Sequence, residues 1–145
     1  MSRPATVHAS ALLAGETGIL IRGASGSGKS SLLLALLDRA SPARLVADDR
    51  VILRPVHDRL LAFAPVELAG LVEIRGQGIV RRPFVSPVVI RLVVDLLPPE
   101  LCARFPDMVE AATLVDGVEL ACLRLPAGAA EGALRVAAAV IALRP

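Results

Sequence analysis

The sequence predicts an α/β fold in which a P-loop nucleotide-binding core sheet carries flanking helices and additional antiparallel strands. Three observations support this class. Residues 23–30 (GASGSGKS) match the pattern G-x-x-x-x-G-K-[ST] at every position. Residues 18–22 (GILIR), directly before them, have the Ile and Leu content of a buried strand, and residues 31–40 (SLLLALLDRA), directly after them, are rich in helix formers. Strand, loop and helix therefore follow in the order that a P-loop requires.

The loop predicts that the chain binds the phosphates of a nucleotide. Its glycines permit backbone conformations that a Cβ would oppose, so successive N–H groups can point towards a phosphate. The N-terminus of the following helix adds partial positive charge. Lys29 is expected to reach the β- and γ-phosphates of ATP, and the Ser30 hydroxyl is expected to bind Mg²⁺. The predicted phosphate-binding residues are Gly23, Ala24, Ser25, Gly26, Ser27, Gly28, Lys29 and Ser30.

The elements around the loop are predicted in order along the chain. Residues 6–14 predict a first strand, which turns at residues 15–18 into the strand before the loop. After the helix, Ser41-Pro42 breaks the pattern, and residues 44–47 predict a short strand that ends at Asp48-Asp49. Residues 88–97 (VVIRLVVDLL) form the clearest strand because of their β-branched content. The other predicted strands are residues 51–55, 60–64, 114–115 and 118–120.

Three further segments complete the predicted fold. Residues 69–80 form an apolar run that Glu73 and Arg75 interrupt, with a tight loop at Gly76 and Gly78. Asp116-Gly117 is a hairpin signal. Residues 129–144 predict a terminal helix without a polar stripe, which should be buried on several faces. Because no repeat or linker interrupts the sequence, residues 1–145 are expected to form a single domain.

Composition excludes several classes of partner. The charges nearly balance, with 16 Lys+Arg against 14 Asp+Glu, and there are only three Phe and no Trp or Tyr, so a nucleic-acid partner is not expected. No apolar run approaches the roughly 20 residues of a membrane span, so we expect a soluble, cytoplasmic protein without a membrane partner. The hydrophobic fraction of 54% favours a homo-oligomer, because excess apolar surface often lies at subunit interfaces. Cys102 and Cys122 lack metal-like spacing and are expected to be reduced structural thiols.

Four positions outside the loop are candidates for chemistry. Asp48-Asp49 closes a strand after the P-loop helix, where one carboxylate could face the metal or substrate while the other supports it; the alternative is a solvated turn. Glu73 is either a metal-linked charge or the partner of Arg75 on the same strand face. His8 could be structural or catalytic. Arg104 could be a surface charge or a functional one.

These features together resemble a known family. His8 lies 15 residues before Gly23 (23 − 8), and the GASGSGKS loop is followed by LVADDRV at residues 45–51 and VEIRGQGIV at residues 72–80. This order resembles the catalytic domain of HPr kinase/phosphorylase, the bacterial enzyme that phosphorylates a serine of the phosphocarrier protein HPr. The match covers residues 8–80 and is weaker beyond Val88.

The resemblance assigns roles to the candidate residues. It implies that Asp49 is the proton acceptor from the substrate serine, that Glu73 is a second Mg²⁺ ligand beside Ser30, and that His8 and Arg104 are active-site residues. It also implies ATP and Mg²⁺ as substrate and cofactor, an HPr-like phosphocarrier as partner, and a hexamer. The chain is similar to short, single-domain forms that consist of the catalytic domain.

The sequence departs from the family in one functional segment. Residues 125–128 (LPAG) lack the basic residues that the family's dephosphorylation segment carries, so we expect kinase activity to exceed phosphorylase activity. Two alternatives remain open at this stage: a P-loop kinase of a small metabolite, and a regulatory module that senses ATP without turning it over.

Overall fold

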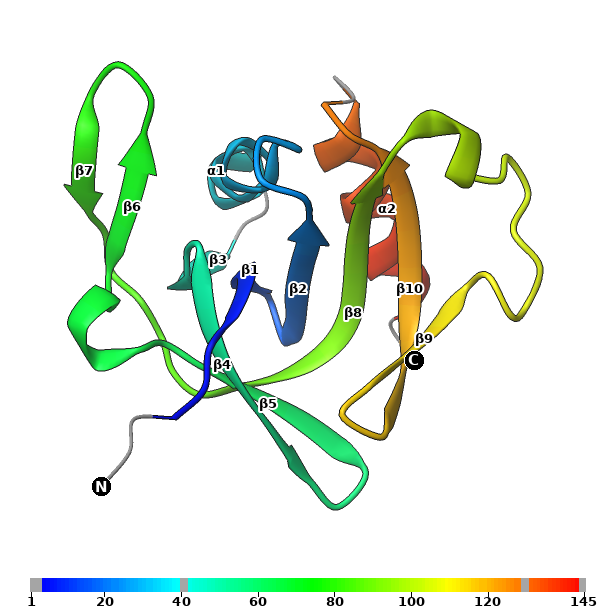
Figure 1. The fold of residues 1–145 in the computed structure, drawn as a ribbon, viewed down its shortest axis with the longest axis horizontal. Helices are drawn as coiled ribbons and strands as arrows, with labels where there is room; N and C mark the ends of the chain where they lie inside the picture. The colour runs from blue at the N-terminus through cyan, green and yellow to red at the C-terminus, as the bar shows by residue number, and fades with distance from the viewer. Residues whose placement is uncertain (1–3, 40–41, 129–130, 144–145) are drawn as a thin grey trace.

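The computed structural model describes residues 4–39, 42–128 and 131–143, and Figure 1 shows its arrangement. Within these residues a β-rich body carries two helices. In chain order the elements are β1 (Val7–Ala14), β2 (Thr17–Gly23), α1 (Lys29–Arg39), β3 (Ala43–Ala47), β4 (Arg50–Val56), β5 (Arg59–Phe63), the 3-10 turn η1 (Val66–Leu68), β6 (Leu71–Ile74), β7 (Gly78–Arg81), β8 (Val88–Leu97), the 3-10 turn η2 (Pro99–Leu101), β9 (Ala112–Val115), β10 (Val118–Pro126) and α2 (Gly132–Leu143).

The main sheet closes on itself. Its strands follow the order β2-β1-β4-β5-β8-β10-β9, and β2 also pairs with β8, so that β2, β1, β4, β5 and β8 form a ring. Most neighbours are antiparallel, as expected for strands joined by short turns. The strand β3 pairs with β1 outside the ring, and the hairpin of β6 and β7 forms a separate two-stranded sheet that projects from the body in Figure 1.

Three strands of the sheet run parallel and end at the same edge. In β2 and β8, Gly23 lies opposite Leu96; in β10 and β8, Pro126 lies opposite Leu97. The segment of residues 23–30 therefore leaves the sheet beside the segments that follow β8 and β10. Ligands of α/β proteins commonly bind outside the carboxyl ends of parallel strands, and this edge is thus the first place to look for a site.

A glycine makes the contact between β2 and β8 possible. A Cβ on Gly18 would lie 2.1 Å from the carbonyl oxygen of Val89, which no side chain could tolerate. The register between the strands shifts directly after this point, where Gly18 lies opposite Ile90 but Ile19 lies opposite Leu92. Gly18 therefore lies where β2 closes the sheet against β8 and allows the two strands to approach. The sequence had indicated only its place at the turn between the first two strands.

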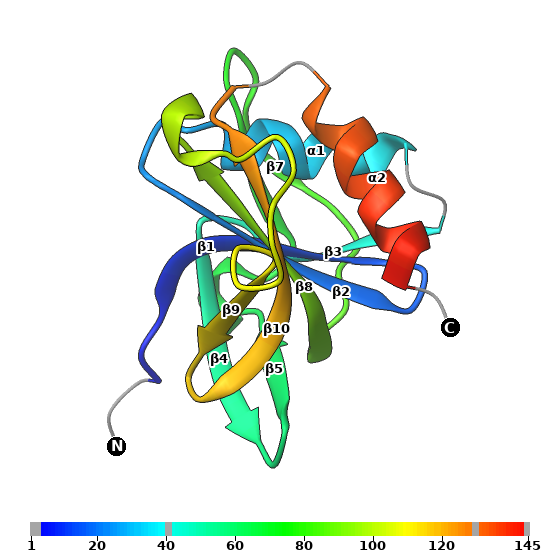
Figure 2. The ribbon, with the colours of Figure 1, turned by 90° about the vertical axis from the view of Figure 1, so that its right-hand side faces the viewer.

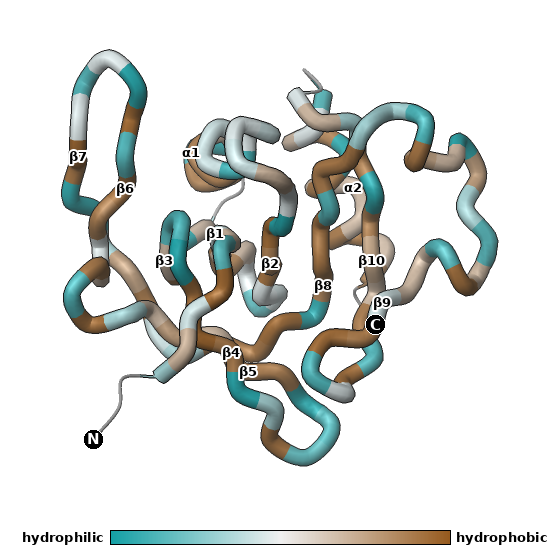
Figure 3. The backbone as a smooth tube through the Cα atoms, in the orientation of Figure 1, coloured by the Kyte–Doolittle hydropathy of each residue, from teal (hydrophilic) through white to brown (hydrophobic). Residues whose placement is uncertain are grey.

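The two faces of the sheet bury separate cores. On one face, Ile19 and Ile21 of β2 pack with Leu33 and Leu36 of α1 and with Val136 of α2. On the other face, the interior of the ring encloses a second cluster, which contains Leu20, Val46, Val51, Leu60 and Val93. Figure 3 shows the hydrophobic residues along β2 and β8, the strands that contribute to both clusters. The alternation of strand side chains explains how one strand serves both cores.

The α/β class and the additional antiparallel strands predicted from the sequence are confirmed, but the arrangement differs from that of a sheet between two helical layers. Both helices pack on the same side of the strands, as Figure 2 shows, because β4 and β5 already cover the other side. The predicted strand of residues 118–120 continues to Pro126 because it pairs with β8 over six further positions.

The terminal helix was expected to be buried on several faces, and within this chain it is not. Its buried residues, Gly132, Ala133, Val136 and Val140, lie on one face, whereas the side chains of Leu134 and Ile141 are each 65% exposed. The first and last parts of that predicted segment, and residue 40 of the first helix, lie outside the described residues. In the described part of the chain, neither helix has the length and apolar character needed to cross a lipid bilayer.

Candidate functional site

The loop of residues 24–28 joins β2 to α1 with a backbone that favours glycine. Gly26 and Gly28 have φ angles of 81° and 100°, in the region that side chains oppose. Gly23 is required for a different reason, because a Cβ there would lie 2.4 Å from the Ser27 hydroxyl oxygen. That hydroxyl is buried and has no hydrogen-bond partner among the described residues. An unpartnered buried hydroxyl in such a loop is a donor available to a ligand.

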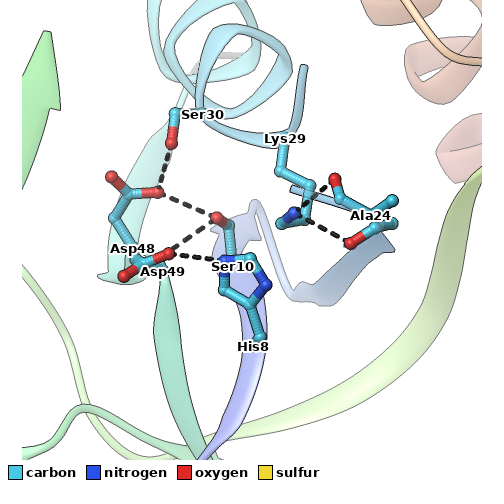
Figure 4. A network of polar contacts seen from close by, with 8 residues as sticks. His8, Ser10, Ala24, Lys29, Ser30, Asp48 and Asp49 are labelled. Atoms are coloured by element: carbon cyan, nitrogen blue, oxygen red, sulfur yellow. Dashed lines mark hydrogen bonds and ion pairs between the residues drawn. The ribbon is translucent and has the colours of Figure 1, made fainter. Parts of the chain in front are cut away.

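Lys29 begins α1 and turns back onto the loop. Its side chain is only 7% exposed, and its ammonium group donates hydrogen bonds to the carbonyl oxygens of Gly23, at 2.8 Å, and Ala24, at 3.0 Å (Figure 4). The charge therefore lies within the loop that the sequence predicts to hold phosphate. The helix N-terminus adds its partial positive charge at the same place.

Ser30 and Asp48 are joined directly. The Ser30 hydroxyl donates a 2.9 Å hydrogen bond to Oδ1 of Asp48, and the hydroxyl of Ser10 donates a second one to the same oxygen, at 2.8 Å (Figure 4). Asp48 is 7% exposed, and Ser10 is fully buried in β1. Two donors to one buried carboxylate oxygen fix its position.

Asp49 faces a different partner. It lies with Asp48 in the two-residue turn between β3 and β4, and its φ of 70° is left-handed, a conformation uncommon for a residue with a side chain. Its Oδ1 lies 2.7 Å from Nε2 of His8. The pair is accessible, with 38% of the His8 side chain and 63% of the Asp49 side chain exposed. The two aspartates thus contact different neighbours. They lie in the turn after β3 and not on a strand, and for the accessible Asp49 this agrees with the alternative of a solvated turn.

One cavity of about 500 Å³ gathers most of the predicted residues. Those that line it are His8, Ser25, Gly26, Gly28, Lys29, Ser30, Asp49 and Glu73. Glu73 reaches it from β6, on the projecting hairpin, and forms no ion pair with Arg75, although both residues are described. The alternative reading of Glu73 as the partner of Arg75 is therefore wrong for this structure.

Arg104 is not among the residues that line this cavity. It lies in the segment between η2 and β9, where its guanidinium is 5.6 Å from the centre of the Phe105 ring. In Figure 1 this segment and the β6–β7 hairpin lie on opposite sides of the molecule. The segment starts beside the loop because β8 ends next to Gly23, but within one chain Arg104 stays apart from the other predicted residues.

Sequence reasoning missed three supporting residues. Ser10 could have been found, because two residues after His8 on a strand is the same face. Arg22 and Asp95 could not, because nothing in the sequence indicates that β2 and β8 are neighbours. Two nitrogens of Arg22 donate to the two carboxylate oxygens of Asp95, at 2.7 and 2.8 Å, directly before the loop begins. The hydrogen bond to Asp95 is the main reason that the pKa of Arg22 is raised.

Comparison with known proteins identifies the family of the chain. The family described as HPr Serine kinase C-terminal domain matches residues 1–99. The chain belongs to this family. The HPr(Ser) kinase/phosphatase from Coxiella burnetii has a similar solved structure, with a TM-score of 0.78, 27% sequence identity and coverage of 95% of each chain. That solved structure and this chain thus share their fold over nearly their whole lengths.

Relatives in this family also match in sequence, over a shorter stretch. An HPr kinase/phosphorylase from Clostridium tetani is 44% identical over 66 residues, which cover 46% of this chain and 21% of the relative. An HPr kinase/phosphorylase from Lactobacillus acidophilus is 47% identical over 64 residues, which cover 43% of this chain and 19% of the relative. The matched stretches thus span about a fifth of the length of these relatives.

Proposed function

We propose that the chain is an ATP- and Mg²⁺-dependent protein serine kinase that phosphorylates an HPr-like phosphocarrier protein. The observation that carries this proposal is the convergence of Lys29, Ser30, Asp49 and Glu73 on one cavity, in a chain of the HPr serine kinase family. Donors for phosphate, oxygen ligands for a cation and a carboxylate for proton transfer are then within reach of one reacting group.

The loop fits the phosphates of ATP. The backbone at Gly26 and Gly28 has the conformation that allows N–H groups to point at an anion, and the buried Ser27 hydroxyl has a hydrogen bond still to make. Lys29 can exchange its bonds to the carbonyls of Gly23 and Ala24 for phosphate oxygens. Catalysis of phosphoryl transfer rests mainly on such positioning and electrostatics.

The site also fits Mg²⁺. The cation prefers oxygen ligands and is usually held by one or two protein groups together with substrate phosphates and water. The described residues contain no cluster of three acidic, His or Cys side chains able to hold a metal alone. We assign Ser30 and Glu73 as ligands, with Asp48 holding the Ser30 hydroxyl in place. When bound, Mg²⁺ neutralises the charge that develops on the phosphate oxygens.

Asp49 is the proposed proton acceptor. Its carboxylate takes the proton of the substrate serine hydroxyl while the serine oxygen forms a bond to the γ-phosphorus of ATP. The bond from that phosphorus to the β,γ-bridging oxygen breaks, and ADP leaves. His8, at 2.7 Å, orients the Asp49 carboxylate. Arg104 remains a proposed active-site residue, which the family resemblance alone supports.

The reverse reaction, phosphorolysis of the phosphorylated carrier, is proposed to be the weaker one. Residues 126–128 lie against the loop, since the Gly128 amide donates to the carbonyl oxygen of Ser27 at 3.2 Å. This contact is between backbone atoms, and residues 125–128 supply no basic side chain to a phosphate. Release of pyrophosphate from phosphorylated carrier and phosphate, at the rate of the forward reaction, would contradict this part of the proposal.

Intact mass spectrometry tests the kinase directly. The protein is incubated with ATP, Mg²⁺ and an HPr-like carrier, and the carrier should gain one phosphoryl group on serine. The matched control is the same carrier with that serine changed to alanine, which should gain none. ADP formation with small metabolites and an unmodified carrier would indicate a metabolite kinase. ATP binding without any turnover would indicate a sensor.

A further inference from the structure

We propose that a second cavity beside the P-loop, between α1 and α2, binds the nucleoside part of ATP. This inference rests on the proposed nucleotide-dependent function and identifies where the base and ribose lie. The cavity has a volume of about 320 Å³. Figure 2 shows the two helices between which it lies, and Pro126 and Gly128, at the end of β10 and just after it, also line it.

The two cavities meet at the loop. Among the described residues, two line both cavities: Gly28 and Ser31, at the start of α1. A nucleotide has two ends, and its terminal phosphate must lie with Asp49, Glu73 and Ser30 in the first cavity if transfer is to occur. In a P-loop, the backbone at the helix start holds the inner phosphates, while the lysine reaches the outer ones. The nucleoside therefore leaves the loop past Gly28 and Ser31.

The two cavities have linings of different chemistry, and each lining suits a different part of the nucleotide. The first contains His8, Lys29, Asp49, Glu73 and Arg75, whose charges suit phosphate, metal and a reacting hydroxyl. The second has small and apolar walls, supplied by Leu32, Ala35, Leu96, Pro126 and Ala133. Apolar side chains that line a cavity together with a few polar groups are typical of sites for uncharged rings.

Small residues keep the second cavity open towards the loop. A Cβ on Gly28 would lie 3.8 Å from the backbone nitrogen of Gly128, so the two glycines face each other across the entrance. Ala35 lies half-buried one helical turn beyond Ser31. Among the described residues that line this cavity, Arg39 is the one with a charged side chain. It lies at the far end of α1, about 15 Å along the helix from Lys29. Its planar guanidinium can stack on a base or donate to ribose hydroxyls.

Binding measurements that compare ATP with tripolyphosphate isolate the nucleoside. Both ligands carry the triphosphate that the loop would hold, and only ATP fills the second cavity. For the wild type, calorimetry in the presence of Mg²⁺ should give an affinity for ATP at least about 10-fold higher than for tripolyphosphate. Equal affinities for the two ligands would overturn the proposal.

Ala35→Leu narrows the cavity without changing helix propensity appreciably. It should weaken ATP binding by about 10-fold, because the larger side chain occupies space that the nucleoside needs. The affinity for tripolyphosphate should stay within about 2-fold of the wild-type value. Ala138→Leu is the matched control, since Ala138 is an exposed position of α2 that lines neither cavity, and it should change neither affinity. An Ala35→Leu protein that retains wild-type ATP affinity would contradict the inference.

A measurement on the wild type keeps the proposal testable if Ala35→Leu disturbs the fold and loses both ligands. Irradiation of the protein with 2-azido-ATP should label α1 beyond Ser31, Pro126 or α2. Labelling confined to β1 or to the β6–β7 hairpin would refute the assignment. A wild type that binds neither ATP nor tripolyphosphate would instead refute the proposed function itself, so the two failures are distinguishable.

Discussion

Ser10 and Asp48, 38 residues apart in the sequence, are joined by a 2.8 Å hydrogen bond inside the protein. Asp48 in turn accepts a hydrogen bond from Ser30, so one buried carboxylate oxygen links β1 to the first turn of α1. The Ser10 oxygen also lies 3.5 Å from the backbone nitrogen of Asp49. The Ser10 hydroxyl, which is not among the described residues that line the cavity, thus positions the proposed metal ligand Ser30 through Asp48 and supports the turn that presents Asp49.

Ser10→Ala is therefore expected to impair Mg²⁺ use. The change removes one of two donors to Asp48, so the Ser30 hydroxyl is held less firmly, and the Mg²⁺ concentration for half-maximal activity should rise. Stability should also fall by about 1–3 kcal/mol, the usual effect of losing a partner of a buried polar group. Ser86→Ala is the control, because it also removes a hydrogen bond, from the amide of Ala64, without touching the site. A stability loss in both variants with no change in Mg²⁺ dependence would leave Ser10 a purely structural role.

Asp49→Asn should remove the proton acceptor and keep the shape of the side chain. Phosphoryl transfer to the carrier is expected to slow by about 10²–10⁴-fold, the range of general-base catalysis. Affinity for the nucleotide should barely change, because Lys29, Ser30 and the loop backbone remain. The control is Asp58→Asn, the same substitution at an exposed turn between β4 and β5. Near-normal turnover would refute the assignment, and an equal loss of ATP binding would make Asp49 part of the metal site.

ATP with Mg²⁺ should stabilise the fold, by about 2.7 kcal/mol at a ligand concentration 100 times the dissociation constant. Lys29→Ala should abolish most of this gain, because it removes the positive charge held inside the loop. Arg59→Ala, which removes an exposed positive charge on β5, is expected to keep the full gain. Thermal unfolding with and without ATP provides the measurement. A wild-type melting temperature that does not change when ATP is added would contradict the proposal of a nucleotide site.

Cys122 should be an unreactive thiol. Burial, with the neighbouring charge of Asp95, raises its pKa from an ordinary value of 9.0 to about 11. In the native protein at about pH 8, iodoacetamide should modify Cys102 first, because Cys122 is buried and the thiolate is the reactive form. In urea both should react at similar rates. Modification of native Cys122 as rapidly as Cys102 would show that the cluster with Arg22 and Asp95 opens in solution.

The same pKa shift predicts a pH effect on stability. The pKa of Cys122 is higher in the folded state than in the unfolded state. The contribution of this thiol to the free energy of unfolding is therefore fully present below pH 9.0 and is lost as the pH rises through about 11. Cys122→Ala should therefore lose less stability than the wild type across this interval. Chemical unfolding at a series of pH values checks the difference, and parallel curves would contradict it.

The free protein is expected to be an oligomer, and the family resemblance suggests a hexamer. Leu134 and Ile141 expose apolar side chains on α2, on the face that turns away from the core. Changing both to Glu should lower the mass measured by light scattering, whereas Val66→Glu, at an exposed residue of η1, should not. A wild-type mass of about 15.1 kDa, that of one chain, would refute the prediction.

Local patterns predicted the elements well because local forces determine them. The strand of residues 88–97 has the predicted bounds, and the helix after the loop begins two residues earlier than predicted and is described as far as Arg39. The closure of the sheet could not be predicted, because β2 pairs with β8 across about half of the chain and nothing in either strand indicates the other. The single buried face of α2 was missed for a similar reason: an apolar helix does not reveal which side its neighbours cover.

The candidate site was predicted in its chemistry more than in its geometry. The loop and Asp49 could be found because motifs with few alternatives contain them, and Glu73 could be found because a charge interrupts an apolar run. Their meeting in one cavity depends on the fold of the β6–β7 hairpin back towards α1. The supporting hydroxyl of Ser10 carries no sequence signal beyond its spacing from His8, and Arg104 could not be placed relative to the loop at all.

The ion pair between Arg22 and Asp95 spans 73 residues, and it lies directly before the loop. The part of the sheet from which the loop extends is therefore complete only when residues 88–97 have paired with β2. Forming such a distant pairing is slow compared with the local hairpin of β1 and β2, because the intervening chain must first be ordered. During synthesis, the GASGSGKS segment leaves the ribosome long before its supporting strand exists. Competence to hold phosphate should accordingly be among the last properties that the folding chain acquires.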